Sequence, residues 1–308
     1  MKLVIQLPCF NEADHIGATM ADLPRSIEGV SSIEFLVIDD GSTDATSEAA
    51  RAAGAHRIVR HPMNRGLATA FQSGVQCALE MGADIIVNTD ADNQYNGEYV
   101  AALIRPILEH RAELVIGIRA IDEIEHFSWA KKKLQKLGSF VVRSISGTEV
   151  RDVTSGFRAF SREAAISINL TTQYTHTLET LVQAGNKSLR IAQVPVRVNG
   201  QRRDSRLFRS SSDYVFRSML DIFRIYLAYR GHRFFAWLGS LLMLPGILLG
   251  LRYVYFELQG RGGGNVQSLI LAAILIIMGF QSWLMAFLLS AQKSSRILIE
   301  RLMSKGKS

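Results

Sequence analysis

The sequence predicts an α/β domain with a mostly parallel sheet over residues 1–200, followed by two long apolar helices. Short apolar runs typical of buried strands alternate with segments of helical period, and this alternation favours parallel strands connected by helices. Polar clusters follow four of these runs, where the strands are expected to end. Further along, residues 234–251 and 266–291 contain no charged residue, and a membrane-spanning helix needs roughly 20 such residues.

The apolar pattern places the expected elements in chain order. Strands are predicted at Leu3–Leu7, Glu34–Ile38, Arg57–Arg60, Asp84–Thr89, Leu114–Ile118 and Ile191–Val198. Helices are predicted at Ala13–Met20, Thr43–Ala53, Leu67–Met81, Gly97–His110 and Ala130–Ile145. Gly54 and Gly82 directly follow two of these helices, where the left-handed backbone that glycine tolerates ends a helix. This order predicts a Rossmann-like sheet with helices on both faces.

Four polar clusters lie at the expected carboxyl ends of strands, at residues 8–12, 39–44, 61–66 and 90–94. An open α/β sheet binds its ligands at this edge. A single acidic cluster could serve only to cap a helix, as Ser42 or Asp44 is suited to do. Four clusters at one edge favour a ligand-binding crevice over four separate caps.

The cluster that follows the Ile85-Ile86-Val87 run is Asp90-Ala91-Asp92-Asn93-Gln94. Its two carboxylates and one amide oxygen suit Mg²⁺ or Mn²⁺ bound to a substrate's phosphates, although a plain surface loop can have the same pattern. Asp39 and Asp40 repel phosphate and instead suit hydrogen-bond donors, such as a base N–H or ribose hydroxyls. The chain has neither G-x-x-x-x-G-K-[ST] nor G-x-G-x-x-G, which argues against a P-loop and a Rossmann dinucleotide site.

Charge divides the chain into an acidic and a basic part. Residues 1–196 have a net charge of −4, residues 197–233 of +6 and residues 293–308 of +4. Basic stretches therefore bracket the apolar ones, which favours an anionic membrane surface over nucleic acid as a partner, and no nucleic-acid binding is expected. Cys9 and Cys77 have no neighbours at metal-ligand spacing, so we interpret them as reduced core residues.

The apolar stretches predict a transmembrane hairpin over residues 234–291, with spans at about 234–256 and 266–291. A buried pair of core helices is the alternative. Pro245 is expected to kink the first span. Arginine and lysine flank both outer ends, so the positive-inside rule places residues 1–200, the basic tail 292–308 and both termini on the cytoplasmic side of an inner or plasma membrane.

Residues 201–233 are expected to join the domain to the hairpin through an arginine-rich loop and an amphipathic helix at Ser212–Arg230. An apolar stripe of Phe216, Leu220, Phe223 and Leu227 recurs there at helical spacing, beside a polar stripe of Arg217, Asp221 and Arg224. This pattern predicts a helix that lies on the inner leaflet. An ordinary surface helix packed on the domain is the alternative.

Several motifs together resemble family 2 glycosyltransferases, which have the GT-A fold. They are Leu7-Pro8-Cys9-Phe10-Asn11-Glu12, Val37-Ile38-Asp39-Asp40-Gly41-Ser42-Thr43-Asp44, Asn64-Arg65-Gly66 and Asp90-Ala91-Asp92-Asn93-Gln94. Asp152-Val153-Thr154-Ser155-Gly156-Phe157-Arg158, Glu179 and Arg202-Arg203-Asp204-Ser205-Arg206 narrow the resemblance to polyprenyl-phosphate glycosyltransferases, similar to dolichyl-phosphate mannose synthase. The two spans match the bacterial members. The resemblance covers essentially the whole chain.

The resemblance implies a role for each group of site residues. The nucleotide sugar is expected at Pro8, Asn11, Glu12, Asp39, Asp40, Arg65, Gly66, Asp90 and Ala91. Asp90, Asp92 and Gln94 are expected to hold Mg²⁺ or Mn²⁺. Catalytic roles fall to Asp92, Arg119, Ser155, Arg158, Glu179 and Arg206. The acceptor phosphate is expected at Arg202, Arg203, Arg206 and Arg209.

Three positions depart from the family pattern. Arg206 stands where lysine is common, Tyr95 where histidine is frequent, and Gly156 where some relatives have an acid proposed to assist catalysis. The loss of that acid need not abolish activity. A lipid monophosphate has a second pKa of ~6 and is already an anionic nucleophile at neutral pH, so a strong general base is dispensable.

The resemblance implies transfer of a hexose from a nucleotide sugar to undecaprenyl or dolichyl phosphate, with inversion and release of a nucleoside diphosphate. A UDP-sugar is favoured and GDP-mannose stays open. One alternative is a family 2 transferase that acts on a glycolipid or polysaccharide, although Gln201-Arg202-Arg203 is not the Gln-x-x-Arg-Trp motif expected of a processive synthase. Another is a nucleotide-sugar-binding membrane scaffold without turnover. Association of the hairpins into a homo-oligomer also stays open.

Overall fold

A computed structural model of the 308-residue chain describes residues 1–119, 143, 147–168, 176–199, 211–260 and 266–305. The chain divides into two compact units, Met1–Asp221 and Ile222–Ser308. The helix predicted at Ala130–Ile145 and the arginine-rich loop with Arg202, Arg203, Arg206 and Arg209 lie outside the described residues.

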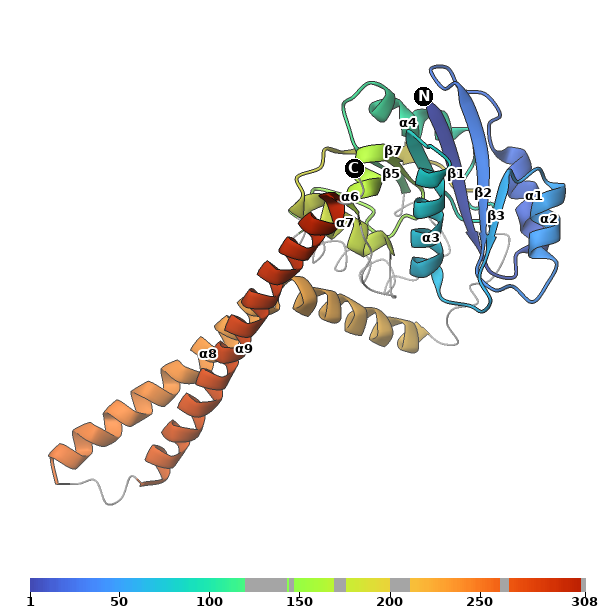
Figure 1. The fold of residues 1–308 in the computed structure, drawn as a ribbon. Helices are drawn as coiled ribbons and strands as arrows, with labels where there is room; N and C mark the ends of the chain where they lie inside the picture. Colours follow the sequence, from blue (N-terminus) through green and yellow to red (C-terminus); the bar gives the residue numbers. More distant parts are fainter. Residues whose placement is uncertain (120–142, 144–146, 169–175, 200–210, 261–265, 306–308) are drawn as a thin grey trace. The chain divides into compact units, whose positions relative to one another are not determined.

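The first unit is built on a seven-stranded sheet with the order β3-β2-β1-β4-β6-β5-β7 (Figure 1). The strands are β1 (Lys2–Cys9), β2 (Ser32–Asp39), β3 (Arg57–Arg60), β4 (Ile85–Asn88), β5 (Leu114–Arg119), β6 (Arg158–Ser161) and β7 (Ile191–Val196). Pairing is parallel except for β6, which runs antiparallel to both β4 and β5. This confirms the predicted α/β class. β6 is the strand that the sequence did not predict.

Helices cover both faces of the sheet, which gives three layers (Figure 1). On one face lie α1 (Ala13–Asp22), α2 (Thr46–Ala52) and α4 (Tyr99–Leu108). Their apolar residues, such as Ile16, Ala50 and Leu103, pack on Leu3, Ile5 and other alternate residues of the strands to form the main core. On the other face lie α3 (Leu67–Glu80), α6 (Arg162–Ser167) and α7 (His176–Asn186).

Strand register brings the predicted site segments to one edge of the sheet. Cys9 of β1 pairs with Asp39 of β2, so the two strands end side by side. Asn88, the last residue of β4, pairs with Arg158, the first residue of β6. Because β6 is reversed, the segment that precedes it joins the loops that follow the parallel strands.

The second unit contains most of α8 (Ser211–Leu258) and α9 (Val266–Lys305). Within them, the 29 residues Arg230–Leu258 and the 27 residues Val266–Gln292 are long and apolar enough to cross a membrane. The predicted amphipathic segment is the first part of α8, and α8 continues through Pro245 to Leu258. A Cβ added at Gly279 would lie 2.3 Å from Met243 Cγ, so glycine allows the two helices to approach closely.

Candidate functional site

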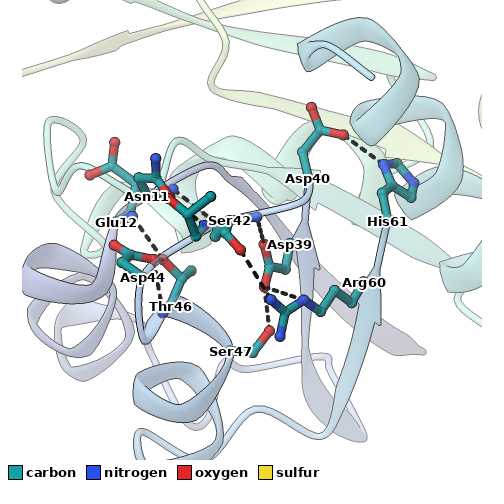
Figure 2. A network of polar contacts seen from close by, with 11 residues as sticks. Asn11, Glu12, Asp39, Asp40, Ser42, Asp44, Thr46, Ser47, Arg60 and His61 are labelled. Carbon is teal, nitrogen blue, oxygen red and sulfur yellow. Dashed lines mark hydrogen bonds and ion pairs between the residues drawn. The ribbon is translucent and has the colours of Figure 1, made fainter. Parts of the chain in front are cut away.

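The loops after β1 and β2 are connected by hydrogen bonds (Figure 2). Asn11, which has a φ of 56°, donates from its backbone N–H to Ser42 Oγ at 2.9 Å. Its Oδ1 accepts from the backbone N–H of Thr43 at 2.8 Å. Glu12 donates from its backbone N–H to Thr46 Oγ1 at 2.9 Å. Pro8, by contrast, is buried within β1. The two predicted donor-binding segments are therefore held together by hydrogen bonds of the chain itself.

Asp39 is fully buried and its carboxylate is used within the protein. Oδ1 accepts from the backbone N–H of Ser42 at 2.8 Å, and Oδ2 accepts from Ser47 Oγ and lies 3.6 Å from Arg60 Nε (Figure 2). Although burial raises the pKa of Asp39, the hydrogen bonds from Ser42 and Ser47 and the charge of Arg60 hold it below its usual range. These contacts indicate that Asp39 fixes the loop after β2.

Asp40 is also buried, and it holds the loop that precedes α3. Its Oδ1 lies 2.6 Å from His61 Nδ1 and accepts from the backbone N–H of Arg65 at 3.0 Å. Its Oδ2 accepts from the backbone N–H of Gly66 at 2.8 Å. The predicted residues Asp40, Arg65 and Gly66 are thus brought together, although Arg65 and Gly66 make these contacts through their backbone.

The Asp90–Gln94 loop follows β4, and three hydrogen bonds from Thr19 and Asn199 anchor its backbone. Thr19 Oγ1 donates to the carbonyl of buried Ala91 at 2.8 Å. Asn199 donates from its backbone to the Gln94 carbonyl at 2.8 Å and from Nδ2 to the Asn93 carbonyl at 3.1 Å. Asp92 is exposed, and its Oδ1 accepts from the backbone N–H of Gln94 at 3.1 Å. The loop therefore presents Asp92 from a fixed backbone.

Asp90 is half-buried and lies against the segment that precedes β6. A Cβ added at Gly156 would lie 3.0 Å from Asp90 Oδ1 and 3.1 Å from Oδ2, so the glycine leaves room for this carboxylate. Burial and the negative charge of Asp92 raise the pKa of Asp90 to about 7, although the charge of Arg119 opposes the shift. A cation bound at the two carboxylates would relieve this repulsion.

The donor set fits a divalent cation that binds together with phosphates. Among the described residues, no group of three or more His, Cys, Asp or Glu side chains could hold a metal ion. Asp90 and Asp92, with the amide oxygen of Gln94, offer oxygen ligands alone. Mg²⁺ is commonly held by one or two carboxylates, with waters and substrate phosphates as its other ligands. The residues present are therefore compatible with Mg²⁺ or Mn²⁺ on a diphosphate.

Arg119 ends β5 and forms a bidentate ion pair with Asp152. Its Nε donates to Asp152 Oδ2 at 2.7 Å, and its Nη2 donates to Oδ1 at 3.1 Å and to Thr154 Oγ1 at 2.8 Å. The side chains are 12% and 1% exposed. Although burial raises the pKa of Asp152, the hydrogen bond and charge of Arg119 hold it below its usual range. Arg119 can therefore meet a phosphate only with the part of its guanidinium that Asp152 does not use.

The other predicted catalytic residues in the described part are buried. Arg158 is 0% exposed and donates to the carbonyls of Ser155, Thr177 and Val153 at 2.8, 2.7 and 2.9 Å, and to Thr180 Oγ1. Burial lowers its pKa to about 10, so it stays a cation at neutral pH. Ser155 and Glu179 are also buried, and Glu179 Oε1 accepts from Gln183 Nε2 at 3.3 Å. Because Arg158 has no exposed surface, we interpret it as a structural residue that holds these carbonyls in place.

Two site residues were missed by the sequence reasoning. Asn88 accepts from Gln6 Nε2 at 2.9 Å and donates from Nδ2 to the Gly156 carbonyl at 2.8 Å, which fixes the segment beside Asp90. The sequence indicates Asn88 only as a polar residue at the end of a strand that is otherwise apolar. His61 lies in one of the four polar clusters, where its contact with Asp40 could not be read from spacing alone.

Comparisons with known proteins show the family and the fold of this chain. The family model described as glycosyl transferase family 2 matches residues 4–168. An uncharacterized protein of Methanocaldococcus jannaschii is 34% identical over 64% of this chain and 81% of its own length. An undecaprenyl-phosphate mannosyltransferase of Micrococcus luteus is 27% identical over 64% and 83%. A UDP-N-acetylglucosamine–dolichyl-phosphate N-acetylglucosaminyltransferase of Methanococcus voltae is 29% identical over 62% and 83%.

Solved structures share the fold. Glucosyl-3-phosphoglycerate synthase from Mycobacterium tuberculosis, in complex with Mn²⁺, UDP and glucosyl-3-phosphoglycerate, aligns with a TM-score of 0.55 and 22% identity. The alignment covers 72% of this chain and 79% of that one. The GT-A-like arrangement of a mixed sheet flanked by helices is thereby confirmed. From the family match across more than half its length, this chain belongs to glycosyl transferase family 2.

Proposed function

We propose that this protein transfers a hexose from a nucleotide sugar to polyprenyl phosphate, with inversion at the anomeric carbon and release of a nucleoside diphosphate. The observation that carries the proposal is the meeting of two different groups at one sheet edge. Asp40 there offers a hydrogen-bond acceptor suited to a nucleobase, and Asp90 with Asp92 offers oxygen ligands for a cation on a diphosphate. The names of the Micrococcus and Methanococcus relatives support the lipid phosphate as acceptor.

The donor half of the reaction rests on the loops after β1, β2 and β4. Asn11 and Glu12 lie beside the Asp39–Asp44 loop, where a ribose and base would bind. When bound at Asp90, Asp92 and Gln94, Mg²⁺ or Mn²⁺ would neutralise charge that develops on the leaving diphosphate. Arg119 lies near these carboxylates, and its positive charge would also stabilise the negative charge that develops on the diphosphate. A UDP-sugar is our favoured donor, because the fold relative was crystallised with UDP and Mn²⁺.

The acceptor half needs cations, because an anionic lipid phosphate must approach an anionic donor. We propose that Arg202, Arg203, Arg206 and Arg209 supply them, since arginine binds phosphate through paired hydrogen bonds. An oxygen of the lipid phosphate attacks the anomeric carbon, a C–O bond forms, and the bond to the diphosphate oxygen breaks. Arg206→Ala should then raise KM for the lipid acceptor more than KM for the donor.

The membrane placement is part of the proposal. The stretches Arg230–Leu258 and Val266–Gln292 would form the transmembrane hairpin, with Arg230, Arg233 and the basic tail on the cytoplasmic side. The catalytic domain and both termini would then face the cytoplasm. This arrangement would place the donor site in the compartment that contains nucleotide sugars, and it would tether the domain to the membrane surface where the lipid phosphate lies.

The test is a transfer assay on the purified full-length protein with Mn²⁺, undecaprenyl phosphate and radiolabelled UDP- and GDP-sugars, with EDTA as a control. A lipid-linked sugar labile to mild acid is expected from one donor, and the anomeric configuration of the product reports inversion. Asp92→Ala should abolish transfer, whereas Glu28→Ala should not, because Glu28 is exposed in the turn before β2 at the opposite edge. Nucleotide binding without any lipid product would favour a glycolipid or polysaccharide acceptor, or a non-catalytic scaffold.

A further inference from the structure

We infer that His61 is a positioning residue of the donor site, which orients the Asp40 carboxylate for a hydrogen bond from the nucleobase. This inference rests on the proposed function, because it concerns the donor half of the same site. His61 is 6% exposed and lies just after β3, where its backbone N–H donates to the Asp39 carbonyl at 2.8 Å. Its ring connects Asp40, in the loop after β2, with Ser73 of α3.

The partners of the ring assign its tautomer. Nδ1 lies 2.6 Å from Asp40 Oδ1, and a carboxylate oxygen is an acceptor, so Nδ1 carries the proton. Nε2 lies 3.0 Å from Ser73 Oγ, whose hydroxyl can donate to the Nε2 lone pair. Ser73 therefore favours the tautomer that directs the imidazole N–H toward Asp40. The ring is fixed at both ends and cannot rotate without losing one of these contacts.

The carboxylate of Asp40 has one acceptor position left over. A carboxylate offers about four lone-pair positions, two on each oxygen. Oδ1 receives the N–H groups of His61 and Arg65, and Oδ2 receives that of Gly66. The remaining position on Oδ2 suits one N–H of a base, such as the imide N–H of a pyrimidine. Together with the backbone N–H groups of Arg65 and Gly66, the His61 ring fixes the direction of Oδ2.

Two substitutions distinguish the Nδ1 contact with Asp40 from the Nε2 contact with Ser73. The amide nitrogen of asparagine at position 61 lies near the place of Nδ1, so His61→Asn can still donate to Asp40. The amide nitrogen of glutamine reaches the place of Nε2, so His61→Gln keeps the Ser73 contact and loses the one with Asp40. The pair is matched, because each variant removes the imidazole and retains one hydrogen bond.

The experiment measures Kd for UDP and for GDP with Mn²⁺ on the full-length protein by calorimetry. For the nucleotide that the unmutated protein binds, Kd of His61→Asn should stay within about threefold of the unmutated value. Kd of His61→Gln should rise by about tenfold or more, as expected when the base loses its hydrogen bond to the charged Asp40 carboxylate. The unmutated protein and His61→Asn should also prefer that nucleotide over its analogue methylated at the ring nitrogen that would donate to Asp40, N3 of uracil or N1 of guanine, and His61→Gln should lose this preference. A purely structural role of His61 would not change the preference.

The outcomes separate this inference from the proposed function. If the unmutated protein binds neither nucleotide, the proposed function fails. If it binds one and the two variants bind it equally well, with equal preference over the methylated analogue, the role of His61 is overturned while the proposed function stands. If His61→Gln does not fold, His61→Phe replaces it, since phenylalanine supplies a planar aromatic ring that has neither nitrogen. In that comparison His61→Asn must still bind more tightly than His61→Phe.

Discussion

Replacing Asp152 by asparagine should destabilise the catalytic domain, because it leaves the charge of Arg119 without its partner. The Asp152 carboxylate is 1% exposed and binds Arg119 through two side-chain bonds of 2.7 and 3.1 Å. Removing one partner of a buried pair typically costs about 3–5 kcal/mol. Arg119 is 12% exposed, so water reaches it to some extent and the lower end applies. For a domain of this size, ~3 kcal/mol corresponds to a Tm lower by about 6–12 °C.

The two cysteines provide an assay that reports on this domain alone. Cys9 and Cys77 are both buried in the first unit, so a dye that fluoresces on reaction with thiols detects its unfolding on heating in detergent. Glu109→Gln is the matched control. Its ion pairs with Arg105 and Arg111 are exposed, so removing the Glu109 charge should leave Tm nearly unchanged.

A double substitution distinguishes an orphaned charge from lost packing. Replacing Arg119 by methionine and Asp152 by leucine removes both charges and keeps apolar volume, so most of the lost stability should return. Transfer activity should not return, because Arg119 is then absent from the site. A fall in Tm of less than about 2 °C in Asp152→Asn, or a double variant as unstable as the single one, would refute the reasoning.

Three further predictions concern other parts of the molecule. Gly41 has a φ of 74° and a Cβ there would lie 2.4 Å from the Met63 carbonyl carbon, so Gly41→Ala should lower Tm in the thiol assay and weaken nucleotide binding. Gly279→Leu should crowd Met243 and destabilise the contact between α8 and α9 by about 1–3 kcal/mol. The SDS fraction at which tryptophan fluorescence changes should then be lower, and an unchanged fraction would contradict this close packing. Burial and the charge of Arg158 lower the pKa of His176 to about 3. Below pH 6.5 the unfolded chain then binds a proton at His176 that the folded chain does not bind, so the contribution of His176 to stability should fall by about 2 kcal/mol from pH 6.5 to pH 5. The raised pKa of Asp90 acts in the opposite direction over this range, so the measurement is the Tm of His176→Phe minus that of the unmutated protein, which should rise as the pH falls to 5.

Most of the fold could be predicted from the sequence, because its strands and helices follow clear periods. β1, β2 and β4 are apolar runs that end in polar clusters, and the two apolar stretches of α8 and α9 are recognised by length alone. β6 was missed because it has only four residues and begins with Arg158, a charged residue that is fully buried. α7 was missed for a related reason, since the polar residues His176, Glu179 and Gln183 are buried beside Leu178, Leu181 and Val182, so burial there does not follow the apolar pattern.

The location of the candidate site was easier to predict from the sequence than the contacts between its residues. The polar clusters at strand ends predicted that the candidate site residues share one edge of the sheet, and Asp40, Asp90 and Asp92 do lie at one edge. The bidentate pair of Arg119 with Asp152 spans 33 residues of sequence, and no local spacing reveals such a contact. The roles of the site residues stay predictions, and Arg202–Arg209 lie outside the described residues.

The reversed direction of β6 has a consequence for how such a protein can diversify. The chain leaves the sheet at Arg119, the end of β5, and re-enters at Arg158, the start of β6, and both points lie at the same edge. A segment that departs from and returns to one edge can change in length and composition without altering strand order or register. Exchanging residues 120–151 between relatives should therefore leave the order of the strands unchanged, with Asp152 retained to hold Arg119.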